Sequence, residues 1–499
     1  MIRTRFAPSP TGFLHVGGLR AALFAYLAAK KQGGEFVLRI EDTDRERLVE
    51  GGVENIVRSL RWAGIIPDEG VWLDESGKII ERGPGGPYVQ SKRLDIYQKY
   101  IQTLLDSEHA YYCFCTKERL EELRKIQEQN KQPTGYDGKC RSLPDDEVKK
   151  GFDAAKPYVI RLKVPKNETT VFHDEIHGDI SFDNAVIDDQ VLIKTDGFPT
   201  YHFAVVVDDH LMRITHVVRG EEWLPSTPKH VLLYQAFGWE PPQYVHIPLL
   251  VNEKKQKLSK RHGDVSVEDF KEKGYLPEAM VNFVALLGWH PENDRELFTL
   301  KELKKEFSVE RISKAPAVFN IDKLDWFNRQ YISKMDFADL TNRAFSFFIN
   351  SGLVKTDDWK LKTENFEWLK RVVALERERA STLVELVENT AFLFTDELMY
   401  ELELLIWKKS TREGTKLKLM ELWEMLKTVK EGDWKEEKIE NAVKSWIDEK
   451  GCDTGEVLWP MRVALSGQKN SPGPFEIAGV LGKEKTLSRI LKAVNLVQS

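Results

Sequence analysis

The alternation of apolar and polar positions near the start of the chain predicts a strand, a helix and a second strand. Residues 3–7 can extend, the Ala- and Leu-rich run 19–31 carries apolar side chains at helical spacing, and residues 35–42 form an apolar run that ends in carboxylates. Two glycines at 33–34 mark the end of the helix. A strand, a helix and a strand of these lengths predict a parallel sheet, in which ligands lie at the carboxyl ends of the strands.

The same kind of pattern predicts further elements along the chain. Helical spacing of apolar side chains indicates helices at 51–66, 91–109, 227–238 and 275–289. Strand-like runs occur at 157–164, 171–172, 185–187, 203–207, 215–223 and 244–251, and an Asp-Gly pair at 196–197 predicts a hairpin. From about residue 331 the periodicity is almost wholly helical. We therefore expect an α/β region followed by an all-helical region.

Length and composition narrow the class of protein. A chain of 499 residues corresponds to about three domains, and 41% hydrophobic with 30% charged residues is typical of a globular protein. There is no apolar run long enough for a transmembrane helix, and the first strand leaves no room for a targeting segment before it. Four cysteines make no disulfide framework, so we expect a cytoplasmic protein. With a net charge of −6, binding to RNA would depend on local patches and shape.

Candidate chemistry first appears in the turn between the first strand and the helix. Prolines and glycines break regular structure at 8–12, and Gly17 and Gly18 then open the helix. Backbone N–H groups and the positive end of the helix dipole face a ligand there, and glycines let a flat base or a phosphate approach the backbone. His15 can donate to a phosphate oxygen from the same edge. The alternative is a Pro- and Gly-rich loop before a buried helix, because the stretch matches neither common phosphate-loop motif.

A strongly basic run follows the predicted strand 244–251. Five of the eight residues from 254 to 261 are basic, and they include Lys257, Lys260 and Arg261. A cationic loop at the end of a strand suits a polyphosphate whose charge moves during a reaction. A solvated surface segment is the alternative interpretation.

Together these two stretches resemble the signature pair of a class I aminoacyl-tRNA synthetase. Residues 15–18 stand where that family carries His-Ile-Gly-His, and residues 257–261 stand where it carries Lys-Met-Ser-Lys-Ser. The sequence is similar to glutamyl-tRNA synthetases in particular at residues 6–12, 39–44, 197–204 and 208–212. The resemblance covers essentially the whole chain, densely through about residue 290 and more thinly after about residue 330.

The resemblance implies a fold class and an activity. It implies a multidomain protein with a Rossmann-like α/β catalytic domain, an α+β insertion and an all-helical C-terminal region that binds the anticodon. The implied reaction is the ATP-dependent attachment of L-glutamate to tRNA(Glu) through glutamyl-adenylate. Mg²⁺ accompanies ATP in such chemistry, although no dedicated protein cage for it is visible in the sequence. We also expect a monomer that does not associate with membranes.

Domain boundaries follow from the same resemblance. The expected domains are a Rossmann-type catalytic domain at 1–112 and 191–255, an insertion that binds the tRNA acceptor end at 113–190, a signature-loop and stem-contact region at 256–330, and an anticodon-binding region at 331–499.

The resemblance further assigns roles to individual residues. The catalytic set consists of His15, Lys257 and Lys260. The ATP-binding set consists of Gly17, Gly18, Glu222, Leu250, Ser259, Lys260 and Arg261. The glutamate-binding set consists of Arg5, Ala7, Ser9, Glu41, Tyr201, Arg219 and Trp223.

Arg219 also has a physical argument of its own. It stands at the end of a predicted strand, and its planar guanidinium can bind both oxygens of a carboxylate. In the family, the matching arginine binds the side-chain carboxylate of glutamate, a contact that rejects the neutral amide of glutamine. An ion pair with Glu221 or Glu222 is the alternative.

Glu41 stands at the end of the second predicted strand, where a parallel sheet meets its ligand. In the family, this position lies beside the amino group of the substrate amino acid. A capping role, or a salt bridge with Arg39, Arg45 or Arg47, is the alternative.

Three of the four cysteines cluster in the sequence. Cys113 and Cys115, with Tyr136 and Cys140, resemble the zinc site of some glutamyl-tRNA synthetases and their close relatives. Thiolates suit Zn²⁺, which takes four ligands in a tetrahedron. Some relatives have a histidine two residues after the last cysteine, where this chain has Ser142, so Tyr136 is the remaining candidate for the fourth ligand. We expect a structural zinc, and three unligated thiols are the alternative.

The helical region offers one candidate residue for the anticodon. Residues 377–383 align with a family segment in which an arginine favours C over U at the third anticodon base, and Arg379 is that candidate. A helix-surface salt bridge with Glu376 or Glu378 is the alternative.

Other functions compete with the synthetase hypothesis. A glutaminyl-tRNA synthetase shares the catalytic half but ends in β-barrels, and the truncated relative that glutamylates a modified tRNA base lacks the helical region. The presence of His15, Lys257 and Lys260 opposes an inactive tRNA- or nucleotide-binding paralogue. Another nucleotidylyl transferase of the same fold does not explain the helical region.

Overall fold

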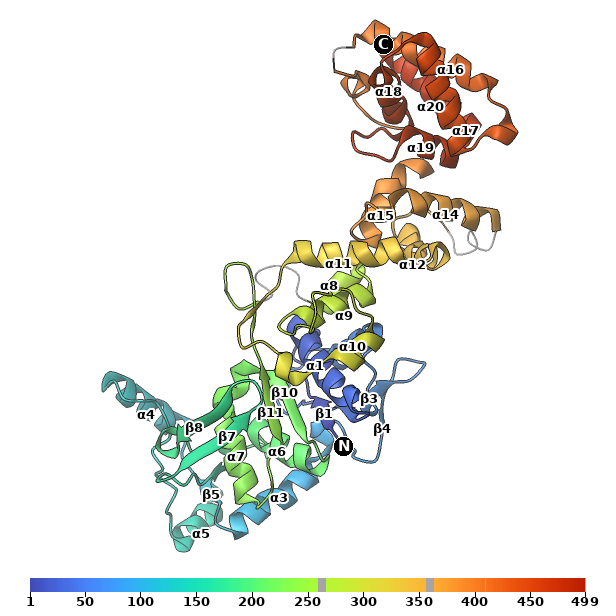
Figure 1. Cartoon of the computed structure of the whole chain (residues 1–499). Helices are drawn as coiled ribbons and strands as arrows, with labels where there is room; N and C mark the ends of the chain where they lie inside the picture. Colours follow the sequence, from blue (N-terminus) through green and yellow to red (C-terminus); the bar gives the residue numbers. More distant parts are fainter. Residues whose placement is uncertain (259–265, 356–362, 409, 499) are drawn as a thin grey trace. The chain divides into compact units, whose positions relative to one another are not determined.

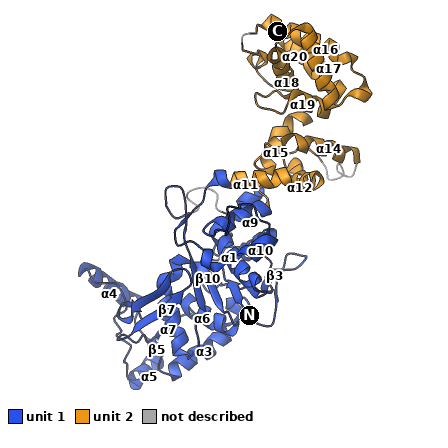
Figure 2. Ribbon diagram, viewed as in Figure 1, with its two compact units in different colours: residues 1–272, 277–323 blue, residues 273–276, 324–499 orange. Residues whose placement is uncertain are grey.

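The computed structural model describes residues 1–258, 266–355, 363–408 and 410–498 (Figure 1). They form two compact units, one of residues 1–272 and 277–323 and the other of residues 273–276 and 324–499 (Figure 2). Every described strand belongs to the first unit, so the expected α/β region followed by an all-helical region is confirmed. In the described part of the chain, no helix is both long enough and apolar enough to span a bilayer.

An eight-stranded sheet forms the centre of the first unit. Its order is β4-β3-β2-β1-β10-β11-β7-β8, and all neighbours are parallel except for the antiparallel edge strands β4 and β8. Its strands are β1 (Arg3–Phe6), β2 (Glu35–Leu38), β3 (Glu69–Leu73), β4 (Ile79–Arg82), β7 (Thr169–Asp174), β8 (Gly178–Asp183), β10 (His216–Gly220) and β11 (Gln243–Ile247).

Strand β1 marks the point at which the order of the sheet reverses. Strands β2 and β3 lie on one side of it, and β10 and β11 lie on the other. The register pairs Thr4 with Phe36 of β2 and with His216 of β10. In open parallel sheets, ligands bind beyond the carboxyl ends of the strands at such a switch point. A ligand site is therefore expected at the loops that follow β1, β2 and β10.

Helix α1 (Val16–Lys31) follows β1 and confirms the predicted helix. Its apolar side chains are buried on nearly all sides, because it packs on β1, β2 and β10 and also on α9 and α10. A helix enclosed in this way needs no polar face, and this explains its Ala- and Leu-rich sequence. The hydroxyl of Thr4 donates to the carbonyl of Ala25 at 2.8 Å and ties the strand to the helix.

The other helices of the first unit cover the sheet and its extensions (Figure 1). They confirm the helices predicted at 51–66, 91–109, 227–238 and 275–289. These helices are α2 (Gly52–Trp62), α3 (Leu94–Asp106), α4 (Lys117–Gln129), α5 (Asp145–Asp153), α6 (Tyr201–Leu211), α7 (Thr227–Ala236), α8 (Val267–Glu272), α9 (Pro277–Leu286) and α10 (Leu300–Glu306).

Two smaller sheets complete the first unit. Strands β5 (Ala110–Cys113), β6 (Val159–Leu162) and β9 (Val191–Ile193) form an antiparallel sheet, and β12 (Leu250–Val251) pairs in parallel with β13 (Ala317–Val318). The strands within residues 113–190 are thus divided between two sheets. β6 joins the three-stranded sheet, whereas β7 and β8 extend the central sheet through β11.

The prediction of a strand at 203–207 is wrong, because these residues lie in α6. Phe203 and Val207 are fully buried, as are the residues between them, and the helix packs among α3, α7 and β9. A run that is buried on every side has the same apolar pattern in a helix and in a strand, so periodicity cannot separate the two. Tertiary packing decides in favour of the helix.

One further strand prediction is wrong in part, and another is wrong. The run 244–251 is divided, because β11 ends at Ile247 and Pro248 has no N–H to continue a ladder. The run 185–187 is not a strand. Residues 184–186 form a short 3-10 turn, in which the side chain of Asp183 accepts from the backbone N–H of Ala185 at 2.8 Å.

The second unit contains no strand among its described residues. Its helices are α11 (Ile321–Lys334), which begins within the first unit, α12 (Phe337–Asn350), α14 (Thr363–Glu376), α15 (Leu383–Thr390), α16 (Arg412–Thr428), α17 (Glu436–Lys450), α18 (Thr454–Ser466), α19 (Pro474–Leu481) and α20 (Lys483–Gln498). Indole groups join parts of this unit, since the half-buried Trp423 donates to the carbonyl of Leu487 at 3.1 Å and the buried Trp434 donates to that of Ala478 at 3.0 Å.

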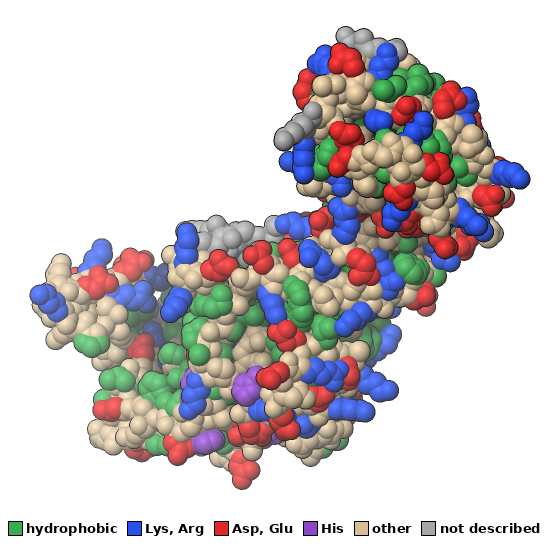
Figure 3. Space-filling model, turned by 45° about the horizontal axis from the view of Figure 1, so that its top comes forward, with side chains coloured by type: hydrophobic (Ala, Val, Ile, Leu, Met, Phe, Trp, Pro, Cys, Tyr) green, Lys and Arg blue, Asp and Glu red, His purple; other side chains and the backbone are tan. Residues whose placement is uncertain are grey.

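Charged side chains of both signs are interspersed on the molecular surface that Figure 3 shows. This agrees with a net charge of only −6 in a chain of 499 residues. A surface of this kind creates no single-sign field, so an anionic partner would be recognised by local groups.

A completely buried carboxylate joins α3 to α6. Asp208 of α6 accepts from Arg93 Nε at 2.7 Å, from the Tyr97 hydroxyl at 2.8 Å and from Gln90 Nε2 at 2.9 Å. A buried charge of this kind is tolerated because both carboxylate oxygens accept hydrogen bonds, one of them from a guanidinium group.

We expect the substitution Asp208→Ala to lower the free energy of unfolding by about 3–5 kcal/mol, because Arg93 would stay buried without its carboxylate. Urea-induced unfolding followed by circular dichroism measures the change. The matched control is Asp106→Ala at the exposed end of α3, which should change the same free energy by less than about 0.5 kcal/mol. Equal effects in the two variants would contradict the structural role of Asp208.

Candidate active site

A cleft of about 1220 Å³ opens at the switch point of the central sheet. Its walls come from the loops after β1, β2 and β10, from the start of α1 and from the segment after β12. It brings together all the described residues of the expected catalytic, ATP-binding and glutamate-binding sets. These lining residues are Arg5, Ala7, Ser9, His15, Gly17, Gly18, Glu41, Tyr201, Arg219, Glu222, Trp223, Leu250 and Lys257. Ser259, Lys260 and Arg261 lie outside the described residues.

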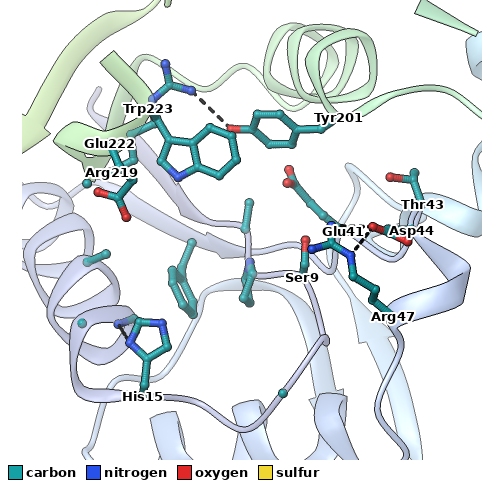
Figure 4. A pocket seen from close by; sticks show the side chains of 18 of the residues that line it. Ser9, His15, Glu41, Thr43, Asp44, Arg47, Tyr201, Arg219, Glu222 and Trp223 are labelled. Carbon is teal, nitrogen blue, oxygen red and sulfur yellow. Dashed lines mark hydrogen bonds and ion pairs between the residues drawn. The ribbon is translucent and has the colours of Figure 1, made fainter. Parts of the chain in front are cut away.

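His15 caps the helix that begins at the cleft. Its Nδ1 accepts from the backbone N–H of Gly18 at 3.1 Å, so the neutral ring carries its proton on Nε2 (Figure 4). A Cβ at Gly17 would lie 3.0 Å from the His15 ring, and a Cβ at Gly18 would lie 2.8 Å from Leu14 Cδ1. Glycine is therefore required at both positions for His15 and Leu14 to keep their places. The arrangement offers an anion backbone N–H groups and a helix N-terminus.

Lys257 reaches the cleft from a short hairpin. After β12, the backbone N–H of Asn252 donates to Gln256 at 2.9 Å, and that of Leu258 donates back to Leu250 at 3.0 Å. This hairpin places the exposed Lys257 at the same cleft as His15. Two cationic or proton-donating groups from distant parts of the chain thus line one cavity, as a polyphosphate site requires.

A buried network of charges forms the floor of the cleft. Asp209 of α6 accepts from Arg5 Nε at 3.1 Å and from Arg39 at 2.8 Å, and Arg39 also pairs with Glu41 at 3.0 Å. The expected alternative partner of Glu41 is therefore present. Figure 4 shows that Glu41 nevertheless points into the cleft, toward Tyr201. Burial raises the pKa of Glu41 to about 7, although Arg39 and Arg5 act in the opposite direction.

Arg219 of β10 has only neutral partners among the described residues. Its guanidinium donates to His246 Nε2 at 3.0 Å, to the Thr227 hydroxyl at 2.8 Å, to the Tyr201 hydroxyl at 3.3 Å and to His230 Nδ1 at 3.3 Å. It is only 7% exposed, and no carboxylate of the described residues lies within ion-pair distance of it.

The alternative interpretation of Arg219 is therefore not observed. Instead of pairing with Arg219, Glu221 accepts from the backbone N–H of Leu249 at 3.0 Å, and Glu222 lines the cleft close to Gly220. A buried cation without an anion is costly, so the cleft is suited to receive an anionic group at this point.

Two aromatic side chains stand beside Arg219. The rings of Tyr201 and Trp223 lie 4.6 Å apart, and Tyr201 comes from the start of α6, the helix that the sequence pattern misassigned (Figure 4). They enclose the space between Arg219 and Glu41 with apolar faces, which strengthens electrostatic contacts inside it.

Sequence reasoning did not single out several residues of the cleft. Thr43, Asp44 and Arg47 line it on the side of Glu41, and Arg47 pairs with Asp44 (Figure 4). Lys194 lines it from beyond β9, and its ammonium donates to the carbonyl of Thr43 at 3.2 Å. Thr43 and Asp44 belong to the segment 39–44, which resembles the glutamyl-tRNA synthetase family, and that resemblance is a sequence signal for both residues. No sequence pattern indicates that Lys194 lines the cleft, because its position depends on the packing of β9.

The four expected metal-binding side chains meet in the three-stranded sheet region. The sulfurs of Cys113, Cys115 and Cys140 all lie within 4.8 Å of one another, and the Tyr136 hydroxyl lies 3.4 Å from Cys113 Sγ and 3.7 Å from Cys115 Sγ. Sulfur ligands on one tetrahedral zinc lie about 3.8 Å apart. The cluster can therefore hold a zinc ion with little rearrangement. Ser142 is exposed.

The thiols of this cluster share their protons unequally. The interaction with Cys140, and then that with Tyr136, lower the pKa of Cys113, and the interaction with Cys113 raises the pKa of Cys140. Arg119 donates to Cys115 Sγ at 3.5 Å, so positive charge also lies close. An environment that favours thiolates is one that favours a soft cation.

Arg379 lies at the end of α14 in the second unit. Its side chain is 42% exposed, and its Nε lies 3.7 Å from the buried carboxylate of Glu376. The salt bridge with Glu376 that we considered as an alternative is thus present, while part of the guanidinium remains accessible to a ligand.

The fold and the cleft define a nucleotide-binding α/β enzyme to which an all-helical unit is attached. Comparison with protein families gives the class. Residues 1–326 match the family of class I tRNA synthetases (E and Q), catalytic domain, and residues 337–494 match the anticodon binding domain. The chain belongs to the class I tRNA synthetases of the E and Q type.

Curated relatives and solved structures are similar over the whole length. The glutamate–tRNA ligase of Clostridioides difficile (strain 630) is 49% identical over 500 residues, which cover 99% of both chains. That of Chlorobaculum parvum (strain DSM 263 / NCIMB 8327) is 47% identical over 512 residues, which cover 99% of this chain and 98% of the relative. A crystal structure of a glutamate tRNA ligase from Elizabethkingia meningosepticum CCUG26117, in complex with its amino acid, has a TM-score of 0.87 at 37% identity and covers 99% of each chain.

We expect the carboxyl group of Glu41 to titrate near pH 7 in the ligand-free protein, because burial disfavours its charged form. Carboxyl-carbon NMR of protein labelled at glutamate should show one resonance that titrates in this range and is lost in Glu41→Gln. The variant Glu54→Gln, in the first turn of α2, serves as the control and should retain that resonance. A spectrum in which every glutamate titrates below pH 5 would contradict the assignment.

Proposed function

We propose that this chain attaches L-glutamate to tRNA(Glu) in an ATP-dependent reaction that passes through glutamyl-adenylate. The similarity to glutamate–tRNA ligases over 99% of the chain supports the reaction, and the match to an anticodon binding domain supports tRNA as the acceptor. The observation that carries the choice of amino acid is the buried guanidinium of Arg219, which faces the cleft without a carboxylate partner among the described residues.

The proposed chemistry requires little acid–base catalysis. The α-carboxylate of glutamate attacks the α-phosphorus of ATP, a phosphorus–oxygen bond forms, and pyrophosphate leaves. A terminal hydroxyl of the tRNA then attacks the carbonyl of the mixed anhydride, loses its proton and releases AMP. Positioning and stabilisation of the phosphate charge supply most of the rate. Mg²⁺ accompanies ATP and is held mainly by the phosphates.

His15, Lys257 and Lys260 act on the phosphates in this proposal. His15 donates from Nε2, because its Nδ1 is engaged by Gly18. Lys260, together with Ser259 and Arg261, is assigned from the signature sequence alone, since these residues lie outside the described part of the chain. Adenosine binds along Gly17 and Gly18 in this proposal, and Glu222 and Leu250 also line this cleft.

Glutamate binds between Arg219 and Glu41 in this proposal. The guanidinium of Arg219 takes the side-chain carboxylate, with the hydroxyl of Tyr201 beside it, and Trp223 covers the methylene groups. Glu41 takes the α-ammonium group, and the positive charge of the ligand stabilises its carboxylate form. The remaining contacts come from β1 and the loop that follows it, through Arg5, Ala7 and Ser9.

The other parts of the chain contact tRNA in this proposal. Residues 113–190 bind the acceptor end, residues 256–330 carry the signature loop and contact the stem, and residues 331–499 bind the anticodon, with the accessible part of Arg379 as a candidate contact. We propose a monomer that acts in the cytoplasm, because protein synthesis consumes charged tRNA there.

Zinc is the proposed structural metal of the first unit. Cys113, Cys115 and Cys140 would bind it as thiolates, and Tyr136 would supply the fourth ligand. The ion would hold β5 against the segment around residues 136–140. It takes no part in the reaction, because all four positions are filled by protein groups.

The test of the proposed function is glutamate-dependent exchange between ATP and pyrophosphate, measured with and without tRNA(Glu). We expect exchange with glutamate and tRNA present, and none with glutamine, because Arg219 has no anion to bind in the amide. Folded protein that shows no exchange under any of these conditions would overturn the synthetase proposal in favour of an inactive binding paralogue.

A variant makes the same test specific for Arg219. The substitution Arg219→Met should raise the KM for glutamate by about 10²- to 10³-fold, because a charge-assisted bidentate contact is lost. The exposed Arg213→Met, from the turn before β10, is the control and should leave that KM unchanged. A small effect of Arg219→Met would place the amino acid elsewhere.

We expect one zinc ion per chain in protein produced with zinc, measured by mass spectrometry of the metal. Cys140→Ser should lose most of the zinc, and Tyr136→Phe should retain it less well against a chelator, because one of four ligands is removed in each. The control is Cys452→Ser, which lies outside the cluster. Zinc-free wild-type protein would support the alternative of three unligated thiols.

A further inference from the structure

We propose that His246 and Asp174 are positioning residues that hold Arg219 in place for the substrate carboxylate without neutralising its charge. The proposal rests on the function proposed above and concerns how the site distinguishes glutamate from glutamine. It draws on a chain of hydrogen bonds across three neighbouring strands. Asp174 ends β7, His246 lies in β11 and Arg219 lies in β10.

The direction of each hydrogen bond follows from Arg219. A guanidinium has five N–H donors and no acceptor, so the 3.0 Å contact between Arg219 Nε and His246 Nε2 requires a lone pair on the histidine. His246 must therefore be neutral, with its single ring proton on Nδ1. That nitrogen lies 2.6 Å from Asp174 Oδ2, and its N–H donates a hydrogen bond to this oxygen. All three side chains are at least 93% buried, so water cannot replace these contacts.

Asp174 is itself held in one orientation. Its Oδ1 accepts from the backbone N–H groups of Ile176 at 3.0 Å and His177 at 2.9 Å, and its Oδ2 also accepts from the backbone N–H of His246 at 3.1 Å. The carboxylate thus sets the tautomer of His246, as the aspartate of a catalytic triad does for its histidine. It cannot turn toward Arg219 without leaving these backbone donors unpaired.

The rest of the environment of Arg219 is also neutral. His230 Nδ1 accepts from Nη1 at 3.3 Å, the Thr227 hydroxyl accepts from Nη2 at 2.8 Å, and the ring of Tyr244 lies 5.8 Å from the guanidinium. Burial and the nearby Arg219 charge hold the pKa of His230 well below its ordinary value, so this ring stays neutral too.

This environment explains how the guanidinium of Arg219 can be held in one orientation and still bind the carboxylate of a substrate. A carboxylate at the position of His246 would orient Arg219 equally well, but it would also neutralise the guanidinium and compete with the substrate. The neutral imidazole of His246 orients the guanidinium of Arg219 without neutralising it. The ring also separates the charge of Asp174 from that guanidinium. Arg219 pairs with no carboxylate of the described residues, so its guanidinium gains a close anion when glutamate binds and gains none from glutamine. The pair therefore contributes to specificity as well as to affinity.

Two substitutions of His246 separate its two nitrogens. In His246→Asn, the side-chain amide can donate to Asp174 but leaves no acceptor near Arg219 Nε. In His246→Gln, the longer side chain carries its carbonyl oxygen to the position of Nε2 and restores that acceptor. We expect His246→Asn to raise the KM for glutamate roughly tenfold, with the KM for ATP unchanged, and His246→Gln to recover most of the loss. The kinetic measurement is aminoacylation of tRNA(Glu) by the full-length chain.

Asp174→Asn tests the tautomer without touching Arg219. The amide oxygen is expected to take the place of Oδ1, which accepts from two backbone N–H groups, so the NH₂ group faces His246 Nδ1. His246 would then carry its proton on Nε2, directed at an N–H of Arg219. We expect a rise in the KM for glutamate of about tenfold or more, with a reduced preference for glutamate over glutamine. The control is the exposed His109→Asn, which should leave the KM for glutamate unchanged.

The outcomes distinguish the inference from the proposed function. If the wild-type chain does not activate glutamate, the proposed function fails. If it does, equal effects of His246→Asn and His246→Gln on the KM for glutamate would overturn the inference alone. A loss of kcat with equal rises in the KM for glutamate and for ATP, together with a lower melting temperature, would also overturn it and assign the pair a merely structural role.

Discussion

The cleft of this protein depends on a buried network of charges that joins distant parts of the chain. Asp209 of α6 binds Arg5 of β1 across 204 positions in the sequence, and it binds Arg39, which follows β2. Buried ion pairs are stable only when nearly every donor and acceptor is used. Here the carboxylate of Asp209 binds two guanidinium groups, and the guanidinium of Arg39 binds the carboxylates of both Glu41 and Asp209. The network ties the two halves of the central sheet together, and it forms the floor on which Glu41 stands.

The arginines of the cleft differ in their partners, and this difference defines its chemistry. Arg5 and Arg39 face carboxylates, so their charges are already balanced within the protein. Arg219 faces histidines, hydroxyl groups and an aromatic ring. The buried Arg219 thus keeps a positive charge that no carboxylate of the described residues pairs with, and a ligand that carries a carboxylate can balance it. In the function proposed above, selectivity for an anionic side chain follows from electrostatics rather than from the size of the cavity.

The part of the cleft that is proposed to bind the phosphates differs from the part that is proposed to bind the amino acid in the origin and exposure of its groups. The groups proposed for the phosphates come from a helix N-terminus and from a basic hairpin whose Lys257 is exposed, whereas Arg5, Glu41 and Arg219, which are proposed for the amino acid, are buried. An exposed cationic region suits a polyphosphate, which arrives with its own cation and must leave after reaction. A buried pocket suits a small amino acid, because low polarity strengthens each contact made to it. The switch point of the sheet places both environments in one cavity.

The sequence by itself determined the class of fold and the helical second unit, because these depend on local periodicity, and its resemblance to a known family supplied the candidate residues that the structure brings together in the cleft. Periodicity indicated α1 and the helices after residue 331, and the glycines at 17 and 18 together with the run at 254–261 marked the phosphate side. Only the tertiary structure decided that 203–207 is helical, since a run buried on all sides carries no periodicity. It also decided that Lys194 lines the cleft and that Arg219 donates a hydrogen bond to His246 rather than to a carboxylate. These are contacts between residues far apart in the chain, and no local pattern encodes them.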